Sequence, residues 1–78
     1  MDLAGKLKAI RAKEGLTQGQ ICELLEFSLS TWKKYEGGHF EMAFGALAKM
    51  LQHPRFTKYT LWLMTGETAA ESGQVSPL

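Results

Sequence analysis

Closely spaced residues that begin and end helices constrain this sequence more than any other feature, because they leave room only for short helices. No proline interrupts residues 1–53, and the apolar residues there recur at helical spacing. An apolar stripe of Leu3, Leu7 and Ile10 predicts a first amphipathic helix, and Gly15 is placed to end it. The chain is therefore expected to begin with one short helix that buries a single face.

Two further short helices are predicted next, joined by a break of only three residues. Thr17 is a suitable N-cap, followed by a helix over about residues 18–25. Ser28 is the N-cap candidate for the next helix, over about residues 29–36, which a pair of glycines ends. Two helices with this short break, the second beginning at a serine, are the pattern of a helix-turn-helix.

Two more helices are expected after the glycines, over about residues 43–51 and 58–64, with Pro54 in the loop between them because proline cannot continue a helix. At 78 residues the chain has room for one small domain. We therefore predict an all-α fold of five short helices, with the folded domain over residues 1–66. The small and polar residues 67–78 are predicted to be a mobile C-terminal tail.

The residues that carry catalysis or bind metals are almost absent from this sequence. Cys22 is the single cysteine, which excludes an intrachain disulfide and multi-cysteine zinc motifs, and we expect a buried thiol there. His39 and His53 have no second ligand at helical spacing, so no metal site is predicted. No phosphate-cradling glycine loop, nucleophile elbow or paired acidic constellation occurs. We expect neither an enzyme nor a cofactor.

Hydropathy and charge limit the surroundings and partners of the chain. No apolar stretch approaches the roughly 18 residues needed to span a membrane, and MDLAGKLKAI has no signal-peptide core. We therefore expect a cytoplasmic protein with no membrane partner. The net charge is +1, but residues 1–66 hold nine basic and six acidic residues, a balance of +3. This balance alone is too weak to indicate a nucleic-acid partner, so the positions of the bases must decide.

The helix over residues 29–36 has two chemically different faces at helical spacing. The inward face is expected to hold Trp32, Tyr35 and Glu36. The outward face holds Ser30, Thr31 and Lys34, with Leu29 and Lys33 at its margins. Short hydroxyl and basic side chains suit contacts with DNA bases and phosphates. The same face is also what an ordinary solvated surface helix presents, and these residues alone leave both interpretations open.

Residues 11–38, RAKEGLTQGQICELLEFSLSTWKKYEGG, resemble the Cro/repressor (Xre-type) helix-turn-helix family of phage and bacterial regulators. The matching features are R-x-x-x-G-L-T-Q, the apolar I-x-x-L-L, and F-S-x-S-T-W-x-x-Y-E-x-G. LWLMTGE at 61–67 resembles the ending of these domains, and HPRFTKYTLWLMTG is most similar to small regulators of pseudomonad prophages. The resemblance implies a compact, five-helix lambda-repressor-like DNA-binding domain.

The resemblance also implies roles for particular residues. The positions that read bases in the family are here Leu29, Ser30, Thr31 and Lys34. The residues that it places at DNA phosphates are Gln18, with Thr17 beside it, and Lys33. His39 is expected there for a different reason, because the glycine-containing loop of residues 37–40 can approach the phosphate backbone. Arg11 and Glu36 match a structural pair that ties the first helix to the end of the third.

Three positions depart from the family pattern. Leu29 stands where glutamine often reads adenine, and it can only contact a thymine methyl or pack against sugar. Glu26 stands where a glycine is frequent in the turn, so it requires a less favourable backbone or a shifted turn. Trp32 replaces a smaller aliphatic residue of the core, which allows an altered angle of the helix.

A second copy of the chain is the expected partner, because one helix in one major groove reads too few base pairs to select a site. The segment 59–64 is richer in large apolar residues than one buried face needs. The residues expected at a dimer interface are Tyr59, Leu61, Trp62 and Met64. On this hypothesis, a charged residue in place of Trp62 gives a folded monomer with much weaker DNA binding.

Two functions from different classes remain in competition at this point. The first is a sequence-specific DNA-binding repressor of a prophage or mobile element, acting as a homodimer on a palindromic operator. The second is an antitoxin-like or other protein-binding helical module in which DNA binding is secondary. The segment after Gly66 would then bind the partner protein, but this segment is short and low in apolar content. No motif identifies an operator sequence, an inducer or a protein antagonist.

Overall fold

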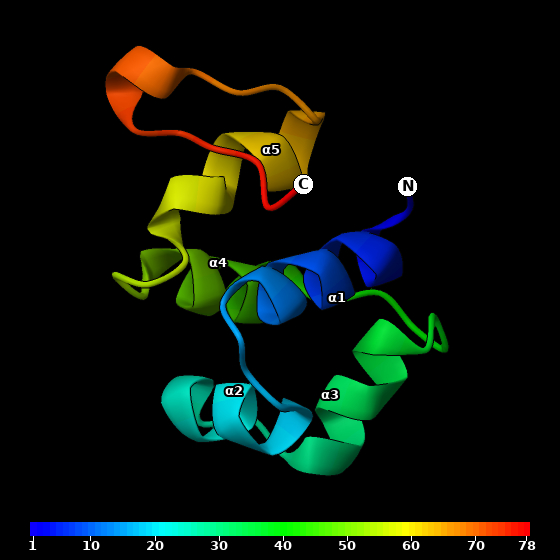
Figure 1. Ribbon diagram of the computed structural model, residues 1–78. Coiled ribbons are helices and arrows are strands. Elements are labelled where there is room, and N and C mark those ends of the chain that lie inside the picture. Colours follow the sequence, from blue (N-terminus) through cyan, green and yellow to red (C-terminus); the bar gives the residue numbers. More distant parts are fainter.

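The computed structural model describes residues 1–78 and is built from helices alone (Figure 1). The α-helices are α1 (Leu3–Lys13), α2 (Gln18–Leu25), α3 (Leu29–Glu36), α4 (Phe44–Gln52) and α5 (Thr60–Thr65). Two 3₁₀ helices follow α4 and α5, namely η1 (Thr57–Tyr59) and η2 (Ala70–Ser72). The predicted all-α class with five helices is confirmed. None of the helices combines the length and apolar composition that crossing a bilayer demands.

The boundaries of α2 and α3 agree with the sequence prediction, and their caps explain why. The Thr17 hydroxyl accepts a hydrogen bond from the Gln20 amide N–H, and the Gln20 side chain accepts one from the Thr17 N–H, which completes a capping box. The Ser28 hydroxyl accepts from the Thr31 N–H at the start of α3. These contacts span three residues, so the local sequence is sufficient to specify them.

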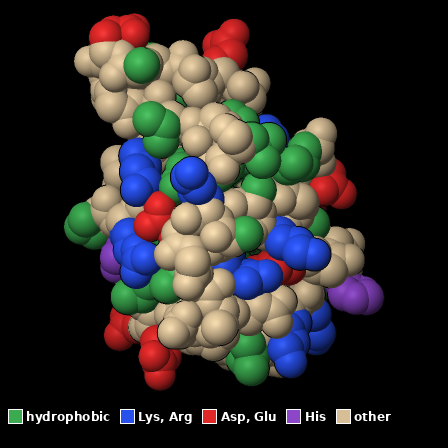
Figure 2. Space-filling model, in the orientation of Figure 1, with side chains coloured by type: hydrophobic (Ala, Val, Ile, Leu, Met, Phe, Trp, Pro, Cys, Tyr) green, Lys and Arg blue, Asp and Glu red, His purple; other side chains and the backbone are tan.

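The C-terminal segment differs from the expected mobile tail, because it folds back along α5 (Figure 1). Ala69 and Gln74 form an isolated antiparallel bridge, and the Val75 N–H donates to the Lys58 carbonyl oxygen at 2.9 Å. Pro77 is buried. Acidic side chains project from this end of the molecule, whereas Lys and Arg side chains gather over the helices below it (Figure 2). The segment is polar in composition, but its backbone and Gln74 have partners on the domain.

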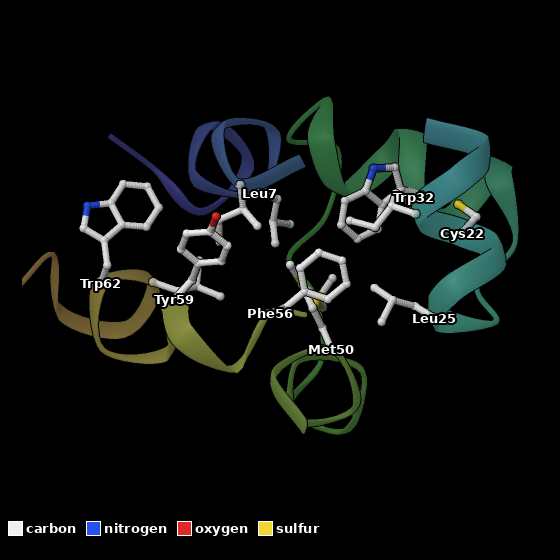
Figure 3. Packing of buried hydrophobic residues seen from close by; sticks show 12 residues of the cluster. Leu7, Cys22, Leu25, Trp32, Met50, Phe56, Tyr59 and Trp62 are labelled. Atoms are coloured by element: carbon white, nitrogen blue, oxygen red, sulfur yellow. The ribbon is translucent and has the colours of Figure 1, made fainter. Parts of the chain in front are cut away.

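Twelve hydrophobic residues form the core, and they come from every α-helix, from η1 and from the loops beside α4. Met50 and Phe56 lie at its centre, between Leu25 on one side and Tyr59 on the other (Figure 3). Trp32 is completely buried against α2, as predicted for the inward face of α3. Cys22 is also a core residue, and burial raises the pKa of its thiol.

Candidate nucleic-acid interface

The turn between α2 and α3 is tight because one residue in it adopts a left-handed conformation. Glu26 ends α2 with φ 58° and ψ 41°, and it is the one non-glycine residue of the chain with positive φ. The Phe27 N–H then donates to the Cys22 carbonyl oxygen at 3.1 Å, which closes the end of α2. The expected unfavourable backbone at position 26 is confirmed. The turn keeps the shape that a glycine would give it.

Hydroxyl groups form a small network at the N-terminus of α3. Besides accepting from the Thr31 N–H at 3.1 Å, the Ser28 hydroxyl donates to the Thr31 Oγ1 at 2.7 Å. The Ser30 hydroxyl lies 3.5 Å from that of Ser28. Because the Thr31 hydroxyl accepts from Ser28, its own proton remains free to be donated outward. The start of α3 therefore presents a cluster of hydroxyl groups, of which that of Thr31 keeps a proton to donate.

An ion pair locks α3 against α1. The Arg11 Nε and Nη2 atoms donate to the two carboxylate oxygens of Glu36 at 2.6 and 3.0 Å, and Arg11 Nη1 donates to the Leu16 carbonyl oxygen at 2.9 Å. The Trp32 indole N–H donates to the same carboxylate. Burial alone would raise the pKa of Glu36, but the hydrogen bonds from Arg11 and Trp32 outweigh it and lower that pKa. The pair fixes the position of α3.

The predicted base-reading residues share one accessible side of α3, as their helical spacing requires. Leu29, Ser30 and Lys34 are exposed, and Thr31 is half-buried. Their neighbours Trp32 and Glu36 face the core and the ion pair. The outward face is therefore held by a rigid inward face, the arrangement that a helix needs to enter a groove.

The predicted phosphate-contacting residues are divided between two places. Thr17 and Gln18 lie at the N-terminus of α2, where the Gln18 Nε2 atom donates to Glu36 at 3.4 Å. Lys33 and His39 are exposed in the last turn of α3 and just beyond it, at the end of α3 that Gln18 also contacts. Helix N-termini and lysine side chains both suit phosphates, so the two places can contact separate stretches of backbone.

One polar cluster has no signal in the sequence, because its members are distant in the chain. The Glu14 carboxylate accepts hydrogen bonds from Arg55 Nε at 2.9 Å and from the Tyr59 hydroxyl at 2.6 Å, and Lys58 Nζ lies 3.0 Å away. Burial alone would raise the pKa of Glu14, but Tyr59, Arg55 and Lys58 together lower it to about 2. Burial and the hydrogen bond to Glu14 raise the pKa of Tyr59. The cluster ties the end of α1 to η1.

The structure corrects the predicted dimer surface. Tyr59 and Trp62 are core residues of the single chain, with 2% and 5% of their surface exposed, so neither is free to contact a second copy. Leu61 is half-buried, and Met64 is 58% exposed. Trp62 is held further by Lys6, whose ammonium lies 5.4 Å from the indole centroid and donates to the Trp62 carbonyl oxygen at 3.3 Å. Only Leu61 and Met64 of the predicted set remain accessible.

Comparison with known proteins identifies relatives of this helix-turn-helix chain. A model of the helix-turn-helix domain family matches residues 2–58, which include α2, the turn and α3. Repressor protein C of Escherichia phage P2 is 36% identical over 75 residues, covering 96% of this chain and 76% of that repressor. The similarity extends over the whole arrangement that positions the outward face of α3.

Proposed function

Because the chain belongs to the helix-turn-helix family of Cro/repressor type, we propose that it is a DNA-binding transcriptional repressor of a phage or prophage. The proposal places α3 in the major groove. The residues proposed for the phosphate backbone are Thr17 and Gln18 at the start of α2, and Lys33 and His39 at the C-terminal end of α3. Occluding a promoter in this way needs no catalysis and no cofactor. The narrower resemblance to regulators of pseudomonad prophages stays a prediction.

The observation that carries the proposal is the contrast between the two faces of α3. The inward face holds the fully buried Trp32 and the Glu36 carboxylate, of which 5% is exposed. The outward face presents Ser30, the half-buried Thr31 and Lys34, which are donors for base edges and phosphates. The bidentate ion pair and the buried tryptophan hold α3 in one orientation, as a helix that reads a groove requires, and so support the proposal.

We further propose that the protein binds a palindromic operator as a dimer. Each wrong base pair costs about 1–3 kcal/mol, so doubling the site through twofold symmetry multiplies the discrimination available to one helix. Leu61 and Met64 line an open groove with Thr60, between α5 and the C-terminal segment. This groove is the apolar surface nearest to the predicted interface that the core leaves accessible. The interface that we now propose is therefore Leu61 and Met64, without Tyr59 and Trp62.

A fluorescence-anisotropy titration tests the DNA-binding proposal. The labelled duplexes are the DNA upstream of the gene that encodes this chain and a scrambled duplex of equal length, each at several salt concentrations. We expect tighter binding of the native duplex by about a thousandfold, falling steeply as salt rises. Equally weak binding of both duplexes would contradict operator binding there and favour the protein-binding alternative, which a pull-down would then examine.

A paired variant tests the role of α3. Ser30→Ala with Thr31→Val removes two outward hydroxyls but keeps the β-branched shape at position 31, so we expect the preference for the native duplex to fall at least tenfold. Glu67→Ala, on the remote C-terminal segment, is the control and should bind as the wild type does. An unchanged preference for the native duplex in the paired variant would show that α3 is not the recognition helix.

A further inference from the structure

Lys34 does not extend toward the N-terminus of α3, where the predicted base-reading hydroxyls lie. Helical Cα–Cβ bonds tilt toward the N-terminus, so an unrestrained lysine would have that direction open to it. Its ammonium instead lies 5.8 Å from the centroid of the Phe40 ring, in the loop that follows the C-terminus of α3. The aromatic face attracts the cation electrostatically.

Phe40 is itself held in place although it lies in a loop. Its ring packs edge-on against Tyr35, with centroids 5.3 Å apart and planes at 87°. Gly38 adopts φ +75° just before it, and this left-handed residue turns the chain back from the end of α3. Phe40 nevertheless remains 44% exposed, so its ring can be reached from the surface. The ring is a fixed and accessible platform.

The location of this platform decides what Lys34 can contact. The N-terminal residues of a recognition helix meet base edges, while the other end of the helix approaches the edge of the groove. Lys33 and His39 are exposed at that same end. A lysine binds phosphate as a point charge, and holding its long side chain beforehand reduces the rotamer freedom that it loses on binding.

We propose that Phe40 is a positioning residue that holds Lys34 for a backbone phosphate at the edge of the major groove. This inference rests on the proposed DNA-binding function and changes one role within it, because Lys34 then neutralises charge and base reading falls to the N-terminal residues of α3. The ammonium keeps its three donors for the phosphate while the ring restrains its side chain.

A double-mutant cycle on DNA affinity tests the inference, using Lys34→Ala, Phe40→Leu and the two combined. The native and scrambled duplexes are titrated at several salt concentrations. We expect Lys34→Ala to weaken both duplexes by the same factor and to reduce the slope of log affinity against log salt by about 1. Phe40→Leu should weaken both by about two- to fivefold in the wild-type background and have no effect in the Lys34→Ala background. Phe40→Tyr, which keeps the ring, should restore wild-type binding.

Several outcomes would overturn the proposal. Loss of affinity for the native duplex alone in Lys34→Ala would make Lys34 a base-reading residue. Additive effects of the two substitutions, or no rescue by Phe40→Tyr, would show that Phe40 does not act through Lys34. A wild-type protein that does not discriminate the duplexes would overturn the proposed function as well, so the two failures are distinguishable. Lys8→Ala, an exposed lysine of α1, controls for the change in net charge, and circular dichroism confirms that each variant folds.

Discussion

The α2–α3 half of the molecule and the half formed by α5 with residues 67–78 are held by different kinds of contact. In the first, Thr17 and Ser28 cap helices through bonds that span three residues. In the second, α5 has no side-chain cap of its own, and the Gln74 side chain accepts from the Leu61 N–H at 2.9 Å. Residues close in sequence thus shape the recognition half, while distant residues complete the other half.

The difference suits the functions proposed for the two halves. A groove-reading helix must keep one orientation, and local caps together with the Arg11–Glu36 pair supply it. Residues 67–78 dock on α5 mainly through backbone groups and the Gln74 amide, and Pro77 is their one buried residue. Such docking has few buried apolar contacts, so this segment is the first part expected to open when the protein is destabilised.

The largest expected effect is a loss of stability caused by a core substitution in the α5 half. Trp62→Ala should reduce the free energy of unfolding by about 3–5 kcal/mol, because it leaves a cavity beneath α1 and removes the contact with Lys6. Urea unfolding followed by circular dichroism measures this. Met64→Ala, at an exposed position on the same helix, should change stability by less than about 0.5 kcal/mol. Equal effects of the two substitutions would show that Trp62 is not a core residue, and Trp62 would again be a candidate for the dimer interface.

A pH titration of stability tests the cluster that joins α1 to η1. The pKa of Glu14 is lowered from its ordinary value of 4.5 to about 2, so its stabilisation is present above pH 4.5 and is lost as pH falls from 4.5 toward 2. Solvent screening at the exposed Arg55 and Lys58 reduces the effect to about 2 kcal/mol. Glu14→Gln should reduce the slope of this part of the stability profile, to which Glu36, whose pKa is also lowered, still contributes. If the Glu14→Gln variant loses stability at low pH as the wild type does, the acid sensitivity comes from other groups.

A smaller effect is expected where the C-terminal segment meets α5. Gln74→Ala removes the acceptor for the Leu61 N–H and the donor to the Thr57 carbonyl oxygen, and should cost about 1 kcal/mol. Hydrogen exchange should show faster opening of residues 67–78 and of the first turn of α5, with α3 unchanged. Glu71→Ala in the same segment is the control, because its side chain makes none of these contacts. Equally slow exchange in the Gln74 variant would show that the segment docks without this amide.

The smallest expected effect is an increase in stability caused by a substitution in the α2–α3 half. Glu26→Gly should stabilise the protein by up to about 1 kcal/mol, because glycine adopts φ 58° without the strain that a side chain causes. The greater entropy that glycine loses on folding offsets part of this gain. The lost ion pair with Lys49, 3.7 Å away and exposed, offsets little of this. Thermal unfolding measures the gain, and Glu26→Ala separates strain from charge because it keeps the strain. Stabilisation by alanine as large as that by glycine would point to charge.

The α2–α3 unit could be predicted closely because its signals are short-range. Capping residues and the apolar spacing of the helices act within a few residues, so they specified both helices to the residue. The resemblance to a known family added the Arg11–Glu36 pair, which spans 25 residues and which no local pattern indicates. The inward position of Trp32 also followed from helical spacing.

The rest was decided by tertiary structure. Composition could not show that Tyr59 and Trp62 are buried, because burial depends on what α1 places over them. Nor could it show that residues 67–78 dock on η1 and α5, since their partners are backbone groups that carry no sequence signal. The direction of Lys34 depends in the same way on a loop that folds back after α3. The sequence by itself determined which segments are helices and which faces are apolar, since these follow from local periodicity and capping. Which apolar residues remain accessible and where a long charged side chain points depend on residues distant in the chain, and only the assembled fold brings those together.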